Sequence, residues 1–338
     1  MFKNIRSNFI LKSIFENITN LKKLNIIKYN LKLIDRLNIA KEDFKVYIYL
    51  KKFKQKYNLK FKDIYPEEIT IYNNIIETKD LEDINKIGFK KLKSLILGWN
   101  KLSNLEILSK INITSLNVLN IINNDIEDIN LLGKINIKDL KILYLNNNSI
   151  SDISILEKVN FRKLKELNLS CNKITDINVL AKVNFTELKL LVLNENKISD
   201  INVLEKVNFK ELELLSLNNN NISNIKVLKN VCFNELLKLD LGNNKINNID
   251  VFKNAKFPKL EILYLNENKI FSINVLEEVN FKELKELSLY TNCISDIRVF
   301  ERTNFEKLEA LYLHYNPVND NCASILENLE EKLELLDK

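Results

Sequence analysis

Hydrophobic and polar positions recur with a period of 24 residues from Phe89 to beyond Phe305, with no insertion or deletion. Each unit reads F-x-x-L-x-x-L-x-L-x-x-N-x-I-x-x-I-x-x-L-x-x-V-N. In the unit 161–184, Leu167 and Leu169 alternate with polar residues, which predicts a short strand. Beyond the asparagine the apolar positions lie three apart, which favours 3₁₀ turns. The pattern therefore predicts coils of strand, turn and tightly wound return segment, stacked around one shared core.

One position of the repeat is asparagine in every coil. These residues are Asn100, Asn124, Asn148, Asn172, Asn196, Asn220, Asn244, Asn268, Asn292 and Asn316. A carboxamide carries both donors and acceptors, so a single side chain can satisfy N–H and C=O groups that turn into the interior. We therefore interpret these asparagines as a structural ladder along the stack. The phenylalanine that begins most coils is expected to form a buried spine.

The core L-x-x-L-x-L-x-x-N-x-L resembles the leucine-rich repeat signature. The I-x-x-I-x-x-L return segment is similar to the class named for the regulatory subunit of protein phosphatase 1, whose coils have about 22 residues against 24 here. The resemblance implies an α/β solenoid, a horseshoe with a concave parallel β-sheet and 3₁₀ or short helical turns on its convex side. It also implies a protein partner on the concave face.

The ends of the chain depart from the period. We predict an N-terminal helical module at 1–65, the solenoid at 66–316 and a C-terminal helical cap at 317–338. Ile69 and Ile71 indicate a degraded first coil ahead of Asn100. An amphipathic helix across the last coil is predicted from the apolar spacing of Leu326, Leu329, Leu333 and Leu336.

The N-terminal module shows helical spacing, and a third helix is predicted over Glu42–Lys56. The segment Ile10-Leu11-x-x-Ile14-Phe15-x-x-Ile18 resembles the centre of an F-box. Next to leucine-rich repeats, this resemblance implies a substrate receptor of a ubiquitin ligase that binds a Skp1-type adaptor through residues 1–65. The alternative is a plain scaffold or phosphatase-regulator-like protein in which the module only caps the first coil, since terminal coils must cover an apolar end.

The charge is unevenly distributed. Residues 1–62 carry 16 Lys and Arg against 4 Asp and Glu, a net charge of +12, whereas the whole chain carries +6. A third and weaker hypothesis is that this basic module anchors the solenoid to an anionic membrane or to RNA. We favour lysines that solvate helix faces over nucleic-acid binding, because basic and aromatic residues do not alternate as in an RNA-binding module.

The side chains that flank the two strand leucines, at repeat positions 6, 8, 10 and 11, are expected to point into the concave groove. Most of them are Asn, Ser, Lys or Glu. The large exceptions are Trp99, Tyr144, Tyr264, Tyr290, Tyr312, His314 and Tyr315. Tyrosine and tryptophan are enriched in binding hot spots. We therefore predict that these seven residues bind the partner, with the centre at Tyr290, Tyr312 and Tyr315.

The sequence gives little support to catalysis. With one histidine, His314, a histidine-based metal cluster is excluded, and with four glycines so are the P-loop and the dinucleotide-binding motif. We expect no enzyme activity, no cofactor and no metal.

The four cysteines form no C-x-x-C motif and predict neither a disulfide framework nor a zinc site. No segment reaches the ~20 apolar residues that cross a bilayer, and the N-terminus lacks the apolar stretch of a signal peptide. These features predict an intracellular protein, cytoplasmic or nuclear.

Overall fold

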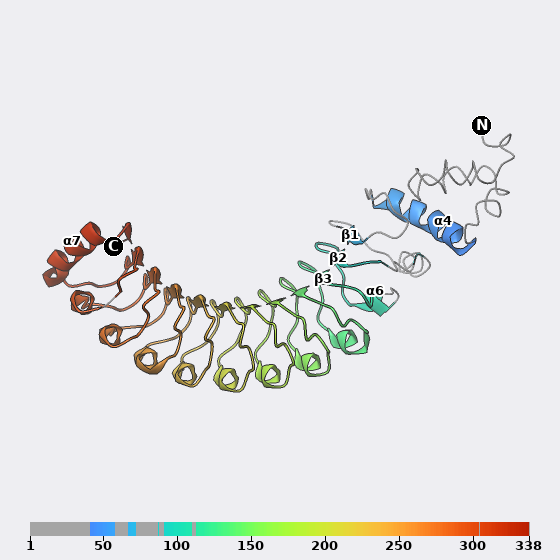
Figure 1. Cartoon of the computed structure of the whole chain (residues 1–338). Coiled ribbons are helices and arrows are strands. Elements are labelled where there is room, and N and C mark those ends of the chain that lie inside the picture. Colours follow the sequence, from blue (N-terminus) through green and yellow to red (C-terminus); the bar gives the residue numbers. More distant parts are fainter. Residues whose placement is uncertain are drawn as a thin grey trace, which may run out of the picture.

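The computed structural model describes residues 41–57, 67–71, 87, 91–109, 113–303 and 305–337. Their coils stack into a curved solenoid with the strands along its concave side and the 3₁₀ turns along its convex side (Figure 1). The strands form one parallel sheet of twelve, in sequence order. This arrangement confirms the predicted α/β solenoid and horseshoe.

The strands are three residues long: β1 (Glu68–Thr70), β2 (Ser94–Ile96), β3 (Val118–Asn120), β4 (Ile142–Tyr144), β5 (Glu166–Asn168), β6 (Leu190–Val192), β7 (Leu214–Ser216), β8 (Lys238–Asp240), β9 (Ile262–Tyr264), β10 (Glu286–Ser288), β11 (Ala310–Tyr312) and β12 (Leu335–Asp337). Among the described residues, the helices are α4 (Lys41–Lys56), α6 (Glu106–Ser109) and α7 (Ala323–Lys332). The 3₁₀ turns are η2 (Asn130–Lys134), η3 (Ser154–Glu157), η4 (Asn178–Ala181), η5 (Asn202–Glu205), η6 (Lys226–Lys229), η7 (Asp250–Asn254), η8 (Asn274–Glu277), η9 (Arg298–Glu301) and η10 (Asp320–Cys322).

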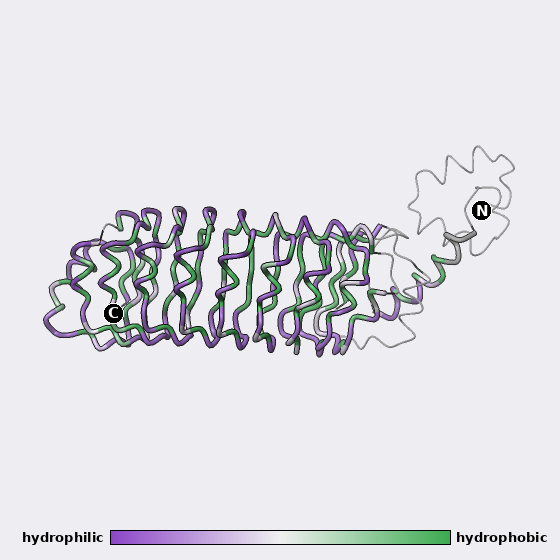
Figure 2. Tube along the Cα trace, turned by 90° about the horizontal axis from the view of Figure 1, so that it is seen from below, coloured by the Kyte–Doolittle hydropathy of each residue, from purple (hydrophilic) through white to green (hydrophobic). Residues whose placement is uncertain are grey.

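The 24-residue period sets the register of the sheet. From β2 to β11 each residue pairs with the residue 24 positions later, as Leu167 does with Leu191 and Leu191 with Leu215. Equal positions of successive coils therefore lie side by side, and the repeating hydrophobic and hydrophilic segments follow the same order from coil to coil (Figure 2). The first pair, β1 with β2, is offset by 26 residues, which confirms the degraded first coil at Ile69.

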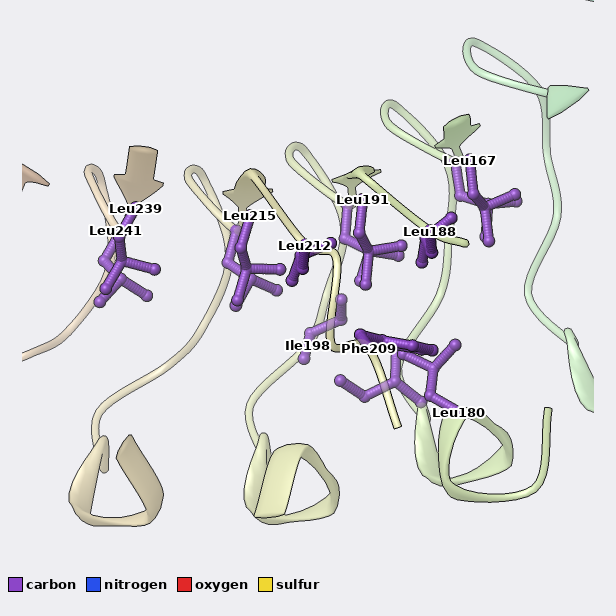
Figure 3. Close-up of a cluster of buried hydrophobic side chains, with 14 of the residues drawn as sticks. Leu167, Leu180, Leu188, Leu191, Ile198, Phe209, Leu212, Leu215, Leu239 and Leu241 are labelled. Carbon is purple, nitrogen blue, oxygen red and sulfur yellow. The ribbon is translucent and has the colours of Figure 1, made fainter. Parts of the chain in front are cut away.

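The core lies between the sheet and the 3₁₀ turns. Strand leucines such as Leu191 and Leu215 have no exposed surface, and Phe209 lies below them, toward the 3₁₀ turns (Figure 3). The first-position phenylalanines from Phe161 to Phe281 are buried, Phe305 is partly buried, and Phe257 stacks on Phe281 with ring centroids 6.3 Å apart. The hydrophobic residues of all coils belong to one cluster, as expected for a solenoid whose core grows lengthwise.

The asparagine ladder is present as predicted. Asn196 donates from Nδ2 to the carbonyls of Leu169 and Leu193, both at 3.0 Å, and accepts from the Ile174 N–H at 2.9 Å. Leu169 and Ile174 belong to the preceding coil, so each carboxamide joins two coils. Asn148 and Asn172 bond in the same way to the coils before them. These side chains satisfy interior backbone groups and hold the turns in register.

Two further local interactions repeat from coil to coil. An Asp or Asn side chain, for example Asp176, accepts the backbone N–H two residues later and so starts the 3₁₀ turn. Lysines pair with carboxylates one coil away, as Lys163 does with Asp139 at 2.6 Å. Such exposed pairs contribute little to stability, because solvent screens them. They support the interpretation of many lysines as solvated surface residues.

The C-terminal end differs from the prediction. The helix α7 covers the predicted Leu326 and Leu329, and Leu329 is buried. The chain leaves the helix at Leu333, however, and Leu336 lies on β12, which pairs with β11. The single helical cap predicted over 317–338 is therefore wrong from Leu333 onward. A strand here covers the otherwise unpaired edge of β11, which a helix would leave open.

At the N-terminal end, α4 confirms the helix predicted over Glu42–Lys56. Its Leu50 and Phe53 are buried and belong to the same hydrophobic cluster as the coils. The F-box-like residues 10–18 lie outside the described part of the chain. The domain boundary at 65/66 also stays a prediction, as does the one at 316/317. In the described ranges, every helix is too short or too polar to cross a membrane.

Candidate protein-binding face

The concave face is built by the residues that flank the buried strand leucines. At position 11, directly before the ladder asparagine, the backbone takes a left-handed conformation in every coil, and the side chain turns outward. These residues, with φ between 47° and 61°, are Trp99, Asn123, Asn147, Cys171, Glu195, Asn219, Asn243, Glu267, Thr291 and Tyr315. For residues other than glycine this conformation costs roughly 1–2 kcal/mol. The turn that delivers the ladder asparagine therefore carries local strain.

Five of the seven predicted aromatic residues gather at the C-terminal coils. Tyr264, Tyr290 and Tyr312 line one hollow in the concave face, with a volume of about 330 Å³. The other residues that line it are Asn218, Asp240, Asn266, Glu286 and Ser288. His314 and Tyr315 lie next to this hollow. We call the five aromatic residues the C-terminal aromatic cluster.

Hydrogen bonds across coils hold two tyrosines of this cluster, Tyr264 and Tyr290, in place. The Tyr264 hydroxyl donates to Glu286 Oε1 at 2.9 Å. Asn266 Nδ2 donates to the Tyr290 hydroxyl oxygen at 2.9 Å, and that hydroxyl donates to Glu267 Oε1 at 3.2 Å. Fixed rings lose little freedom on binding, which favours their use as anchors.

His314 extends the cluster toward the chain end. Its ring stacks on Tyr290, with centroids 4.5 Å apart and an interplanar angle of 9°, and Tyr315 meets His314 edge-on at 4.9 Å. His314 Nδ1 is 2.9 Å from Asp337 Oδ2 on β12, without the alignment of a hydrogen bond. Tyr315 is 81% exposed, so this aromatic stack ends in a ring that is open to solvent.

Trp99 and Tyr144 lie apart from the cluster. Trp99 is 54% exposed at the N-terminal end of the sheet. The Tyr144 hydroxyl donates to Glu166 on the next strand, in the same relation as Tyr264 to Glu286. The structure therefore divides the seven predicted residues into one cluster of five and two separate positions.

The environment of the face shifts several pKa values. Burial, followed by the hydrogen bond to Glu166 and its charge, raises the pKa of Tyr144 to about 12. The same causes, with Glu286 in place of Glu166, raise the pKa of Tyr264. Burial also raises the pKa of the Asp240 carboxyl, against the opposing hydrogen bond from the Gly242 N–H. The tyrosines are thus neutral hydrogen-bond donors around neutral pH.

Replacing Glu166 by glutamine is expected to lower the Tyr144 pKa below about 12, because a neutral acceptor replaces a charge, while burial keeps it above its ordinary value of about 10. Since the folded-state pKa is raised, the neutral phenol contributes stability below about pH 10 that is lost as the pH rises through about 12. NMR titration of tyrosine rings, assigned with Tyr144→Phe, measures the shift. Glu187→Gln on an exposed surface is the control, and an unchanged Tyr144 pKa in Glu166→Gln would contradict this account.

The acidic partners of the tyrosines were not among the residues predicted from the sequence. Asp240 and Glu286 both line the hollow, and Ser288 forms part of it. The sequence does contain a signal for these pairs. In both Tyr144–Glu166 and Tyr264–Glu286, a tyrosine at repeat position 8 is followed 22 residues later by its glutamate partner. Such a pair joins neighbouring strands and is invisible to any pattern read within one coil.

Little in the face resembles a catalytic centre. Within the described ranges, no group of three or more His, Cys, Asp or Glu side chains could hold a metal ion. All four cysteines are unpaired, and Cys232 and Cys293 are exposed.

Comparison with known proteins agrees with this geometry. The family model of leucine-rich repeats in two copies matches residues 138–182. An internalin from Listeria monocytogenes has a similar structure with a TM-score of 0.62 and 28% sequence identity, and the match covers 80% of this chain and 79% of that chain. The chain folds as a leucine-rich repeat solenoid.

Two more distant structures share the fold of this leucine-rich repeat protein. A leucine-rich repeat protein of Leptospira interrogans matches with a TM-score of 0.53 and 21% identity, over 84% of this chain and 80% of that chain. The plant peptide hormone receptor RGFR1, in complex with RGF2, matches with a TM-score of 0.58 and 20% identity, over 79% of this chain and 43% of the receptor chain. No curated protein sequence matches. The fold is typical of scaffolds that bind other proteins.

Proposed function

We propose that this leucine-rich repeat protein binds a partner protein on its concave face, with the C-terminal aromatic cluster as the main anchor. One observation carries the proposal: Tyr264, Tyr290 and Tyr312 line a single hollow, and their neighbours continue it to the exposed Tyr315. Partly buried, fixed tyrosines that surround a depression have the character of a binding hot spot.

The dimensions of the face support a macromolecular partner. Twelve strands spaced ~4.8 Å apart give a sheet roughly 50 Å long. A standard interface buries about 800 Å² per partner, which needs a surface of this length rather than a single small pocket. The absence of insertions between coils leaves the sheet continuous, so one partner can contact several coils.

Alanine at Tyr290 or at Tyr312 is expected to weaken partner binding by on the order of 30-fold each, which corresponds to about 2 kcal/mol for a hot-spot residue. The partner is first isolated by affinity purification with the full chain, and its affinity is then measured by calorimetry. Phe271→Ala is the matched control, because Phe271 is an aromatic side chain that is 61% exposed and does not line the hollow.

The proposal fails if both tyrosine variants bind the isolated partner as tightly as the unchanged protein does. A fall in melting temperature in either variant would point to misfolding rather than to a lost contact. Trp99→Ala tests the second predicted position, and its effect on affinity shows whether the partner reaches the N-terminal end of the sheet.

A link to a ubiquitin ligase is a finer hypothesis within this proposal. It is supported by the F-box-like sequence at Ile10–Ile18 and by the combination with leucine-rich repeats. Mixing the full chain with a purified Skp1-type adaptor tests it, with Leu11→Asp as the variant that removes an apolar contact residue of the resembled motif. If the full chain forms no complex with the adaptor, the cap interpretation is favoured. If anionic vesicles or RNA retain the full chain in a salt-sensitive manner, the anchor hypothesis is favoured.

The intracellular location stays a prediction. We propose a reducing compartment because two exposed thiols, Cys232 and Cys293, would be open to oxidation elsewhere. Localisation of the tagged full chain by microscopy tests this proposal.

A further inference from the structure

We infer that the hollow formed by Tyr264, Tyr290, Tyr312, Asp240, Glu286 and Ser288 accepts a basic side chain, lysine or arginine, of the bound partner. The inference rests on the proposed function and specifies the chemistry of the partner at its main anchor.

The register explains why a hollow exists at this place. Asp240, Tyr264, Ser288 and Tyr312 follow one another in a single row across β8 to β11. The small Ser288 therefore stands between two tyrosines on strands about 10 Å apart, which is twice the strand spacing. A short side chain between two large ones leaves a gap, and the gap opens toward the concave groove.

Gly242 leaves room for Asn266, one of the residues that line the hollow. A Cβ atom at Gly242 would lie 2.7 Å from Asn266 Oδ1, closer than ordinary contacts allow. Asn266 can thus lie against the backbone of β8's coil and reach the Tyr290 hydroxyl at 2.9 Å. The glycine thereby allows the contact that orients Tyr290 at the hollow.

The charges that line the hollow are negative. Asp240 and Glu286 contribute carboxylates, and Glu267 accepts from the Tyr290 hydroxyl nearby. Lys238 is the opposing charge, with its Nζ 4.2 Å from the centroid of the Tyr264 ring. The two carboxylates that line the hollow favour a cation there, and the Lys238 contact shows that the Tyr264 ring already accommodates one.

Unpartnered oxygens point to a ligand that donates hydrogen bonds. Ser288 is 2% exposed, lines the hollow, and its Oγ has no hydrogen-bond partner. Asn218 Oδ1, at the β7 side of the hollow, is also buried without a partner. The Asn218 carboxamide oxygen only accepts, and the Ser288 hydroxyl can accept, so N–H donors suit both open positions. An ammonium or guanidinium group supplies such donors together with the matching charge.

Aromatic rings complete the recognition of a cation. Rings around a cation stabilise it through their negative faces, and the effect grows when water is excluded. The volume of about 330 Å³ suits the end of one long side chain better than a folded element of the partner. An anionic or purely apolar anchor would leave Asp240, Glu286 and the buried oxygens without favourable contacts.

The direct test is NMR titration of the full chain with N-acetyl-arginine methylamide and with N-acetyl-citrulline methylamide, which has nearly the same shape and no charge. N-acetyl-lysine methylamide is the second cationic probe. We expect the cationic amides to shift the ring signals of Tyr264, Tyr290 and Tyr312, and to bind at least 10-fold more tightly than the citrulline amide. No preference for either cationic amide over citrulline overturns the inference.

A matched pair of variants tests whether the cationic amides bind in the hollow. Glu286→Gln is expected to weaken binding of the cationic amides at least 10-fold, and Glu166→Gln is expected to leave it unchanged. Glu166 is the equivalent residue five coils earlier, with its own tyrosine donor, but it does not line the hollow. Equal effects of the two variants would show a general charge effect and would overturn the site.

The isolated partner distinguishes this inference from the proposed function. If Tyr290→Ala abolishes partner binding but Glu286→Gln and replacement of the partner's basic residues do not alter it, the concave anchor stands and the cation site is wrong. If neither variant affects partner binding, the proposed function fails as well. The inference is supported if Glu286→Gln and the removal of the partner's basic charge each weaken binding. Combining the two changes should then cause no further loss.

Discussion

Replacing Asn196 by alanine is expected to lower the free energy of unfolding by about 2–4 kcal/mol, mainly because one buried N–H loses its acceptor. That group is the Ile174 N–H, which donates to Asn196 Oδ1 at 2.9 Å. The carbonyls that accept from Asn196 Nδ2 lose less, because each of them keeps another side-chain donor. Leu169 O keeps the donor Asn172 Nδ2 at 3.0 Å, and Leu193 O keeps Asn220 Nδ2 at 3.0 Å. Most of the lost stability therefore comes from the Ile174 N–H, which is left without an acceptor.

Urea denaturation measures this change, with Asn194→Ala as the control. Asn194 lies two residues away at a half-buried groove position and is expected to change stability by less than about 0.5 kcal/mol. An equal and small effect of the two variants would show that the ladder contributes little.

Asn196→Asp separates the two roles of the carboxamide. An aspartate keeps the acceptor for Ile174 but places a carboxylate against three carbonyl oxygens, at Leu169, Leu193 and Asn194. We expect a raised pKa for this aspartate, because burial and the carbonyls favour its neutral form. Its protonated form then contributes stability below about pH 4 that is lost as the pH rises. The deficit relative to the unchanged protein should therefore be smallest in acid.

Replacing Phe209 by alanine is expected to cost about 3–5 kcal/mol, the usual range for removing a fully buried aromatic ring. Phe209 is 2% exposed and lies between the strand leucines and the convex turns (Figure 3). In a solenoid each coil contacts only its neighbours, so the loss should concentrate in the coils next to the cavity. The expected result is local loosening rather than uniform weakening of the whole chain.

Native-state hydrogen exchange resolves this pattern coil by coil. We expect faster exchange around β6 and β7 in Phe209→Ala and unchanged exchange at β3, while the exposed Lys210→Ala leaves both unchanged. Faster exchange of equal size at β3 would contradict nearest-neighbour stabilisation and would indicate one cooperative unit along the sheet.

Most of the fold follows from the sequence because each coil repeats the same local rules. The ladder asparagine, the strand leucines and the three-residue spacing of Ile174 and Ile177 require only the pattern within one coil and its copy in the next. The turn at position 11 was not foreseen, since residues as different as Thr291 and Cys171 adopt its left-handed conformation. There the ladder hydrogen bonds outweigh the intrinsic preference of each residue.

The C-terminal strand and the acidic side of the hollow could not be derived in the same way. Leu333 and Leu336 continue a helical spacing, and only the open edge of β11, a feature of the assembled sheet, favours a strand at that point. Asp240 and Glu286 look like ordinary surface carboxylates until the register places them beside Tyr264. In both cases the decisive contact joins residues that are distant from each other in the repeat pattern.

The constant offset of 24 residues has a consequence for altering the length of the molecule. Excision of residues 185–208 would join Asn184 to Phe209, two residues that occupy the same repeat positions as Asn208 and Phe209 do now. The strand β5 would then meet β7 in place of β6, with leucine again facing leucine. The solenoid can thus be shortened by one complete coil, while the C-terminal coils that form the cation-accepting hollow keep their present structure.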